Sequence, residues 1–416
     1  MIFSLRNIFI IFFALFFLTI SPPLSDAFYY REKDDSYLEL RGLARLFGNG
    51  YRHQNNDLLF PERSGADLSG LLRLIGEAQI TSDIFFEMNL YQAYVPFEFT
   101  SNQPELGLSL DVERSAALEW SLSNSNYAHL AMDRLNLRWS NRHLDITAGR
   151  QAINLATTFF FSPNDFFAPF AAQTFYRLYK PGVDAVRTEV RLGNLSQLSM
   201  ISVSGYSPDI TSDTGWSNRP SRQRDSHLAR ISTVFGYFEW AVLGGIIHNN
   251  NTVGASIQGE IFSHIGLRAE GNLSRNRIKG KNHVTGFSIG IDRHFENSLD
   301  IRIEHFYNGK GASDPEKYTD IMTVFGNDIS YLGRNYTAFG LGYEFTPLLR
   351  GDMSVIANMS DHSILCSFYS VYSLSNETDL SVNISIPFGK SPEGMMIGSE
   401  FGLLPYSLNI ELRHFF

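Results

Sequence analysis

Apolar and polar residues alternate along most of this 416-residue chain. Residues 253–261 show the pattern well: Val253 and Ile257 share one parity, and Gln258 and Glu260 share the other. A repeat of two residues places the two sets on opposite faces of a β-strand. After residue 27 the sequence has almost no helical periodicity, and the repeat continues without a domain break. The pattern therefore predicts an all-β protein with one folded domain.

The alternating runs predict eighteen strands. Their expected ranges are 37–47, 67–80, 84–95, 127–140, 143–154, 182–193, 195–206, 227–236, 238–248, 252–262, 265–276, 283–294, 298–308, 335–346, 351–360, 363–374, 378–387 and 405–416. The alternation slips in 195–206 and 363–374, so sixteen strands are the alternative count. Residues 113–123 are a candidate for a further strand.

Alternating strands fit two architectures, and the connections between strands distinguish them. A soluble β-sandwich has short turns at both ends, whereas a transmembrane barrel has short turns at one end and long loops at the other. Tight turns are expected at 81–83, 141–143, 193–195, 296–298 and 375–378, and they alternate with long connections at 48–66, 97–126, 155–180, 207–226, 309–333 and 388–404. This asymmetry favours a transmembrane antiparallel up-and-down β-barrel. With about 16 to 18 strands, such a barrel is wide enough for an aqueous channel.

The first residues differ from the rest of the chain. One cation, Arg6, precedes an unbroken apolar run from Ile8 to Ile20, and small residues follow up to Ala27. The run is too short for a helix that crosses a bilayer core, which takes about 20 residues. The pattern is typical of a secretory signal peptide, residues 1–27, cleaved after Ala27. We therefore expect an exported chain whose barrel covers residues 28–416.

Composition argues against several other classes of protein. A single cysteine, Cys366, excludes an intramolecular disulfide framework and any CxxC metal or redox site. A net charge of −9 without a basic block makes nucleic acid an unsuitable partner. The sequence has no P-loop, dinucleotide-binding, HExxH or GxSxG motif. We therefore expect no enzymatic activity, no cofactor and no metal site.

The last ten residues, SLNIELRHFF, are expected to form the strand that closes the barrel. Leu408 and Ile410 would face lipid, Glu411 and Arg413 would face the lumen, and Phe416 would lie at the periplasmic interface. Closure is required because an open strand edge in lipid leaves N–H and C=O groups unpaired. A terminal strand that ends in phenylalanine also resembles the signal by which barrel-assembly machinery recognises Gram-negative outer-membrane proteins.

The least repetitive stretch, 149–187, contains three short motifs. They are Gly149-Arg150-Gln151, Ser162-Pro163-Asn164-Asp165 and Pro181-Gly182-Val183-Asp184-Ala185. On these motifs the chain resembles a large, mostly uncharacterised group of Gram-negative outer-membrane porin-like proteins, in which they frame a long loop. The chain departs from that pattern in two places: Asn154 to Ala156 stand where Trp-Gly is expected, and Lys180 stands where arginine is expected. The resemblance implies a barrel embedded in outer-membrane lipid.

The loop at 155–180 is rich in phenylalanine and tyrosine. A contiguous apolar surface of this kind normally marks a contact surface. The resemblance to porins implies that the loop folds into the lumen and narrows the channel. The candidate constriction residues are Phe161, Asp165, Phe166, Arg177 and Lys180. The alternative is that the loop packs on the barrel rim or on a neighbouring protomer, and a homotrimer is one candidate assembly.

Charged residues on the polar parity of the strands are the candidates for a pore lining. They are Arg187, Glu189, Arg191, Glu260, Arg268, Glu270, Arg302, Glu304, Glu411 and Arg413. The cations among them could attract anionic solutes. Alternatively, arginine and glutamate on adjacent strands pair and satisfy one another.

Three functions are compatible with these observations. The first is a channel for passive diffusion of small hydrophilic solutes. The second is a non-conducting barrel whose loops bind a partner or a surface polymer. The third is a channel for hydrophobic compounds, with the phenylalanine-rich loop along its path.

Overall fold

The computed structural model describes residues 28–54, 60, 63–94, 112–121, 128–209, 211–212, 214–262, 264–277, 283–318, 331–394 and 396–416. The predicted signal peptide lies outside the described residues, as do parts of several predicted loops. Within the described ranges, no helix is long and apolar enough to cross a membrane.

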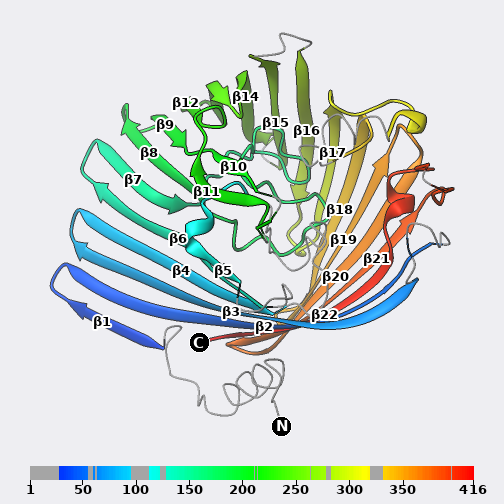
Figure 1. The fold of residues 1–416 in the computed structure, drawn as a ribbon, viewed down its shortest axis with the longest axis horizontal. Coiled ribbons are helices and arrows are strands. Elements are labelled where there is room, and N and C mark those ends of the chain that lie inside the picture. The colour runs from blue at the N-terminus through cyan, green and yellow to red at the C-terminus, as the bar shows by residue number, and fades with distance from the viewer. Residues whose placement is uncertain are drawn as a thin grey trace.

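Eighteen long strands form a closed antiparallel barrel in the described part of the chain. They are β2 (Ser36–Arg52), β3 (Ser64–Thr81), β4 (Ile84–Tyr94), β6 (Ala128–Ser140), β7 (Leu144–Gln151), β8 (Val183–Arg191), β9 (Ser196–Val203), β12 (Ser226–Phe235), β13 (Phe238–Ile247), β14 (Asn250–Ile261), β15 (Ile265–Asn276), β16 (Val284–His294), β17 (Asp300–Asn308), β18 (Asn335–Thr346), β19 (Leu349–Asn358), β20 (Ser363–Ser375), β21 (Thr378–Phe388) and β22 (Tyr406–Phe415). Each strand pairs with the next in this order, and β2 pairs with β22 to close the ring (Figure 1). The predicted fold and its count of eighteen strands are confirmed, and the alternative of sixteen is wrong.

The largest boundary difference concerns β2 and β3, predicted as 37–47 and 67–80, which extend across 36–52 and 64–81. Part of the long connection expected at 48–66 is therefore strand. The added residues pair from Gly48↔Leu68 to Arg52↔Ser64.

The candidate strand at 113–123 is confirmed only in part. Within its described residues the stretch contains a 3₁₀ turn, η2 (Ala116–Leu118), and a short strand, β5 (Glu119–Ser121), which pairs with β6. The edge of β6 from Leu135 onwards pairs with β7, so only a short part of that edge is left for β5. Two further short strands, β10 (Tyr206–Pro208) and β11 (Trp216–Pro220), form a separate hairpin.

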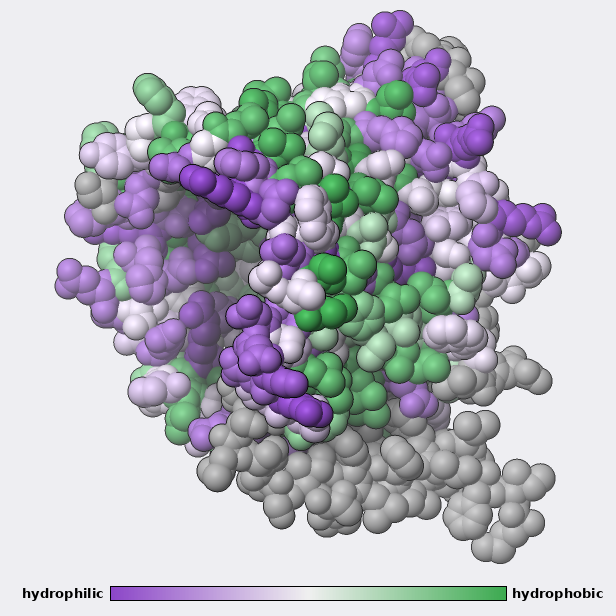
Figure 2. All heavy atoms as spheres, turned by 90° about the vertical axis from the view of Figure 1, so that its left-hand side faces the viewer, coloured by the Kyte–Doolittle hydropathy of each residue, from purple (hydrophilic) through white to green (hydrophobic). Residues whose placement is uncertain are grey.

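The two faces of the strands differ in exposure as the alternation predicts. Along β22, Leu408 and Ile410 are 44% and 47% exposed, whereas Glu411 and Arg413 are 6% and 3% exposed. Figure 2 shows a broad area of hydrophobic residues beside hydrophilic residues that surround a hollow. The outer face of the barrel is therefore mainly apolar, and the polar side chains gather inside.

The C-terminus is fixed to β2 near β1 (Tyr29–Lys33), the first strand among the described residues, which also pairs with β2 (Figure 1). The N–H of Phe416 donates to the carbonyl of Gly42 at 3.0 Å, and the N–H of Gly42 donates back at 2.6 Å. The Phe416 ring lies 5.8 Å from the Phe28 ring and is 7% exposed. The ring expected at a membrane interface is thus covered by protein, because Phe28 packs over it.

Candidate functional site

Residues 155–180, here called the aromatic segment, belong to the connection between β7 and β8, which runs inside the ring of strands in Figure 1. The motifs at its two ends meet at its base. Arg150 donates from Nε and Nη2 to the two carboxylate oxygens of Asp184, at 2.9 and 3.1 Å. The residues are partners in the β7–β8 register, and Arg150 is 1% exposed. A two-point arginine–carboxylate pair is among the strongest polar contacts in proteins. It ties the start of the segment to its end.

Gly149 gives this base its backbone conformation. Its φ of +118° lies in the region that favours glycine, and an added Cβ would lie 2.3 Å from the carbonyl oxygen of Leu135. Both facts require glycine at the first position of the Gly-Arg-Gln motif.

A second tie closes the segment on itself. The Lys180 ammonium forms an ion pair with the Asp165 carboxylate, and the residues are 6% and 5% exposed. Burial raises the pKa of the Asp165 carboxyl, while the Lys180 charge opposes the rise. Arg177 braces the same region by donating to the carbonyls of Phe159, Ala172 and Thr174. These three charged candidates are therefore bound within the segment.

Glu304 on β17 anchors the start of the segment. Its carboxylate accepts the N–H of Phe159 at 2.8 Å and the N–H of Phe161 at 2.7 Å, and the N–H of Phe160 lies 3.2 Å away. Ser288 on β16 adds a hydrogen bond of 2.9 Å. Three successive N–H groups around one carboxylate make an anion-binding turn, here satisfied by the barrel wall itself.

Glu270 on β15 is a second anchor. It accepts the N–H of Thr157 and, at 3.1 Å, the N–H of Asn164. The Asn164 amide donates to the carbonyl of Ala255 at 3.0 Å, and Asn272 donates to the carbonyl of Pro163 at 2.6 Å. The middle motif is thus held against β14 and β15.

Several phenylalanines of the segment belong to two hydrophobic clusters. Phe161 is 1% exposed and stacks on Phe306 of β17, with ring centroids 4.9 Å apart. Phe167, 3% exposed, packs with residues of β8, β9, β12 and β13, and the partly buried Phe166 lies against that cluster. The segment therefore contacts distant parts of the barrel wall.

Arginines of the wall lie over two of the segment's rings, Phe159 and Tyr176. Both Arg268 and Arg302 stack on Phe159, at 4.3 and 4.6 Å from the ring centroid. Arg45 and Arg413 stack on Tyr176 at 4.5 and 4.6 Å. Cation–π contacts contribute about 0.5–2 kcal/mol each, depending on how far they are desolvated.

The predicted pore-lining residues fall into two groups in the structure. Glu270, Glu304, Glu411 and Arg413 are at most 6% exposed, with partners on the wall or the segment. The other predicted pore-lining residues are more exposed to solvent. They are Arg187 and Glu189, 3.4 Å apart, Arg191 beside Asp145, Arg268 beside Asp292, Arg302 beside Asp300, and the exposed Glu260.

A buried network beside the segment was not predicted. Arg114 donates to Asp133 at 2.8 Å and pairs with Glu119, while Arg73 on β3 donates to the other oxygen of Asp133 at 2.9 Å. Ser115 donates its N–H to Asp184 at 2.8 Å. Residues 112–121 thereby join the base of the segment. Their charged residues were visible in the sequence, but the alternation does not show which strand they approach.

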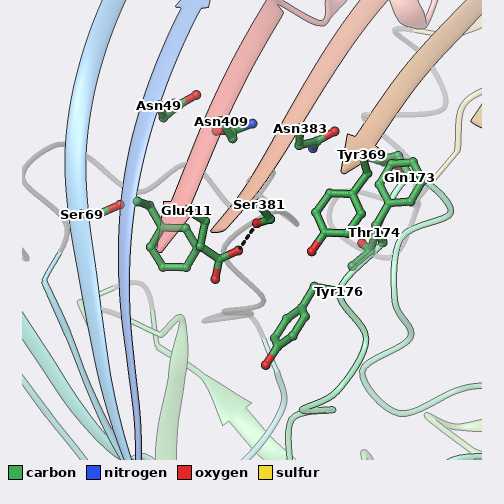
Figure 3. A pocket seen from close by; sticks show the side chains of 12 residues that line it. Asn49, Ser69, Gln173, Thr174, Tyr176, Tyr369, Ser381, Asn383, Asn409 and Glu411 are labelled. Carbon is green, nitrogen blue, oxygen red and sulfur yellow. Dashed lines mark hydrogen bonds between the residues drawn. The ribbon is translucent and has the colours of Figure 1, made fainter. Parts of the chain in front are cut away.

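A pocket lies between the segment and the wall formed by β2, β3, β20, β21 and β22 (Figure 3). Its polar lining includes Asn49, Asn383, Asn409, Gln173 and Glu411. Its aromatic lining is Phe47, Phe175, Tyr176 and Tyr369. Among the described residues there is no group of three or more His, Cys, Asp or Glu side chains that could hold a metal ion.

This geometry defines the class of fold: a closed eighteen-stranded antiparallel barrel with a long segment bound to its inner wall. No family model and no curated protein sequence matches the chain. Solved structures with the same fold include OccAB3 of Acinetobacter baumannii, at a TM-score of 0.58 and 9% identity over 92% of this chain and 99% of that one. OccK2 (OpdF) of Pseudomonas aeruginosa aligns at a TM-score of 0.57 and 9% identity, over 91% of this chain and 97% of that one. OccK2 has also been solved in complex with glucuronate.

Proposed function

We propose that the chain forms a water-filled channel in the outer membrane of a Gram-negative bacterium, through which small hydrophilic solutes diffuse passively. The observation that carries the proposal is the closed ring with an apolar outer face and polar side chains inside. Closure leaves no open edge between strands, so the backbone can be satisfied in lipid. The shared fold with the Occ proteins supports the same conclusion.

In this proposal the aromatic segment narrows the channel. Its support is the set of ties to Glu270, Glu304 and the Arg150–Asp184 pair, which fix the segment to widely separated strands. The predicted lining residues that are not buried, among them Arg268 and Arg302, would border the remaining passage. A rigid constriction selects solutes by size and by the hydrogen-bonding groups along it.

The proposed function requires that the chain is exported and assembled into the outer membrane. The signal peptide at 1–27 would direct the chain across the inner membrane and be removed. The barrel-assembly machinery would then recognise the C-terminal strand ending at Phe416. Among solutes, the OccK2 complex makes small carboxylates such as glucuronate reasonable first probes for anionic substrates.

Proteoliposome swelling tests the proposal. Vesicles containing the purified protein are placed in isotonic solutions of uncharged solutes of increasing size, beside protein-free vesicles. We expect swelling that is fast for the smallest solute and slows as size rises. The proposal is wrong if vesicles with the protein swell no faster than protein-free vesicles in every solute.

A further inference from the structure

Three asparagines stand side by side on the inner wall. In the strand register, Asn409 of β22 pairs with Asn49 of β2 on one side and with Asn383 of β21 on the other. All three line the pocket described above, and Figure 3 shows them in one row along neighbouring strands. The row therefore presents primary amides at a single level of the barrel.

Two of these amides have unused hydrogen-bonding capacity. The Oδ1 atoms of Asn49 and Asn383 are buried and have no hydrogen-bond partner among the described residues. Asn383 as a whole is 9% exposed. A buried polar atom without a hydrogen-bond partner destabilises the protein, and a bound polar ligand that supplies the missing partner would remove that penalty. Thr174 of the segment, 6% exposed, has an unpaired Oγ1 in the same lining.

The pocket presents little free charge. Glu411 is the one ionisable acid or base among the residues found to line it, apart from the tyrosines. Its carboxylate is bound by Arg45, with Nε to Oε1 at 2.5 Å, and by Ser381 at 3.3 Å. Arg45 and Arg413 lie over Tyr176 and are 2% and 3% exposed. An anionic ligand would thus find no exposed cation in the lining to pair with. A neutral ligand needs no such partner.

The remaining lining is aromatic. Phe175 stacks on Tyr369 with centroids 5.1 Å apart, and Phe47 lies on the β2 side of the pocket. Amides that donate and accept, together with apolar rings, match a molecule that has hydroxyl groups around its edge and C–H groups on its faces. Sugars have this arrangement.

We propose that this pocket is a binding subsite for a neutral carbohydrate, with Asn49, Asn383 and Asn409 hydrogen bonding its hydroxyl groups. The inference rests on the proposed function, because a sugar would reach the inner wall through the channel. It goes further by naming a ligand class and the residues that recognise it.

The test is isothermal titration calorimetry on the protein purified in detergent, with maltose and glucuronate as probes. Asn383→Ala and Asn409→Ala each remove one amide from the row, and each should weaken maltose binding about fivefold, the equivalent of one lost hydrogen bond. Asn251→Ala is the matched control, because Asn251 is an exposed asparagine of β14 that does not line the pocket. Its affinity should equal that of the unaltered protein.

The outcomes separate this inference from the channel proposal. Calorimetry measures binding without conductance, so a weakening of maltose binding in Asn383→Ala supports the subsite even if vesicles do not swell. Vesicle swelling without measurable maltose binding overturns the subsite and leaves the channel standing. Binding of glucuronate alone, or maltose binding unchanged in both pocket variants, also overturns it.

Discussion

The N–H of Phe161 donates to the carboxylate of Glu304 at 2.7 Å, although 143 residues separate the two in the chain. The bond joins the aromatic segment to β17, far around the ring from β7 and β8, which carry the ends of that segment. With the neighbouring bonds from Phe159 and Phe160, it makes Glu304 the main anchor of the segment.

Substitution of this anchor should loosen the segment. We expect Glu304→Gln to lower the free energy of unfolding by about 2 kcal/mol, because a neutral amide has only one acceptor oxygen for several N–H donors. Denaturant unfolding in detergent measures the change. Glu260→Gln is the control, since Glu260 is an exposed glutamate on the polar face of another strand, β14, and it should change stability by less than about 0.5 kcal/mol. Equal effects of the two variants would count against the anchoring role.

The Arg150–Asp184 pair should be sensitive even to a conservative change. Arg150→Lys keeps the charge but loses the two-point geometry and leaves buried acceptors without donors, so we expect a loss of about 3 kcal/mol in unfolding free energy. Arg191→Lys alters an arginine whose side chain is 44% exposed, and its expected cost is below about 1 kcal/mol. The account of the motifs is wrong if both variants unfold at the same denaturant concentration.

Gly42 should be required for the packing of the C-terminal residue, Phe416, against β2. A Cβ at this position would lie 2.0 Å from the Phe416 ring, so Gly42→Ala must displace the ring and the backbone bonds beside it. On the same strand, a Cβ at Gly48 would meet nothing closer than 3.9 Å. Heat-modifiability on gels should show incomplete folding for Gly42→Ala and a normal folded band for Gly48→Ala. A normal band for both would contradict this packing.

A pH dependence is expected at Glu400, in the connection between β21 and β22. Its carboxylate accepts the N–H of Leu332 and the amide of Asn358, at 3.2 and 2.7 Å, and burial raises its pKa to about 7. Because the folded pKa lies above the unfolded value, the folded form binds more protons between pH 4.5 and about 7. The contribution of this group to stability therefore falls as pH rises through that window.

Hydrogen exchange at Leu332 and Gly333 should follow the ionisation of Glu400. We expect faster exchange at pH 8 than at pH 5.5 after correction for the intrinsic rate, and a smaller difference in Glu400→Gln. The assignment to Glu400 fails if that variant keeps the full difference.

Much of the barrel could be predicted because a period of two is a local property of each strand. The parity of Leu408 and Glu411 alone tells which of them is exposed. The path of the aromatic segment is not local, so the sequence could not show that Glu270 and Glu304 would be buried by its backbone rather than stand as free lining charges. The cation–π contacts of Arg45 with Tyr176 and of Arg73 with Tyr179 were not predicted for the same reason. The alternation shows the face on which each arginine lies, but it does not show where the segment places the two tyrosines.

The segment's effect on the passage can be tested by replacing 159–179 with a short glycine linker. If the segment narrows the channel, single-channel conductance should rise severalfold, because a barrel of eighteen strands is wide without it. The variant's folding is checked by heat-modifiability on gels. A folded variant with unchanged conductance would place the narrowest point elsewhere.

Single-channel recording of the unaltered protein in a planar lipid bilayer is the decisive experiment on the proposed channel. We expect steady ionic current in discrete steps, carried by the water inside the closed ring. Folded protein that inserts into the bilayer and passes no current would contradict it.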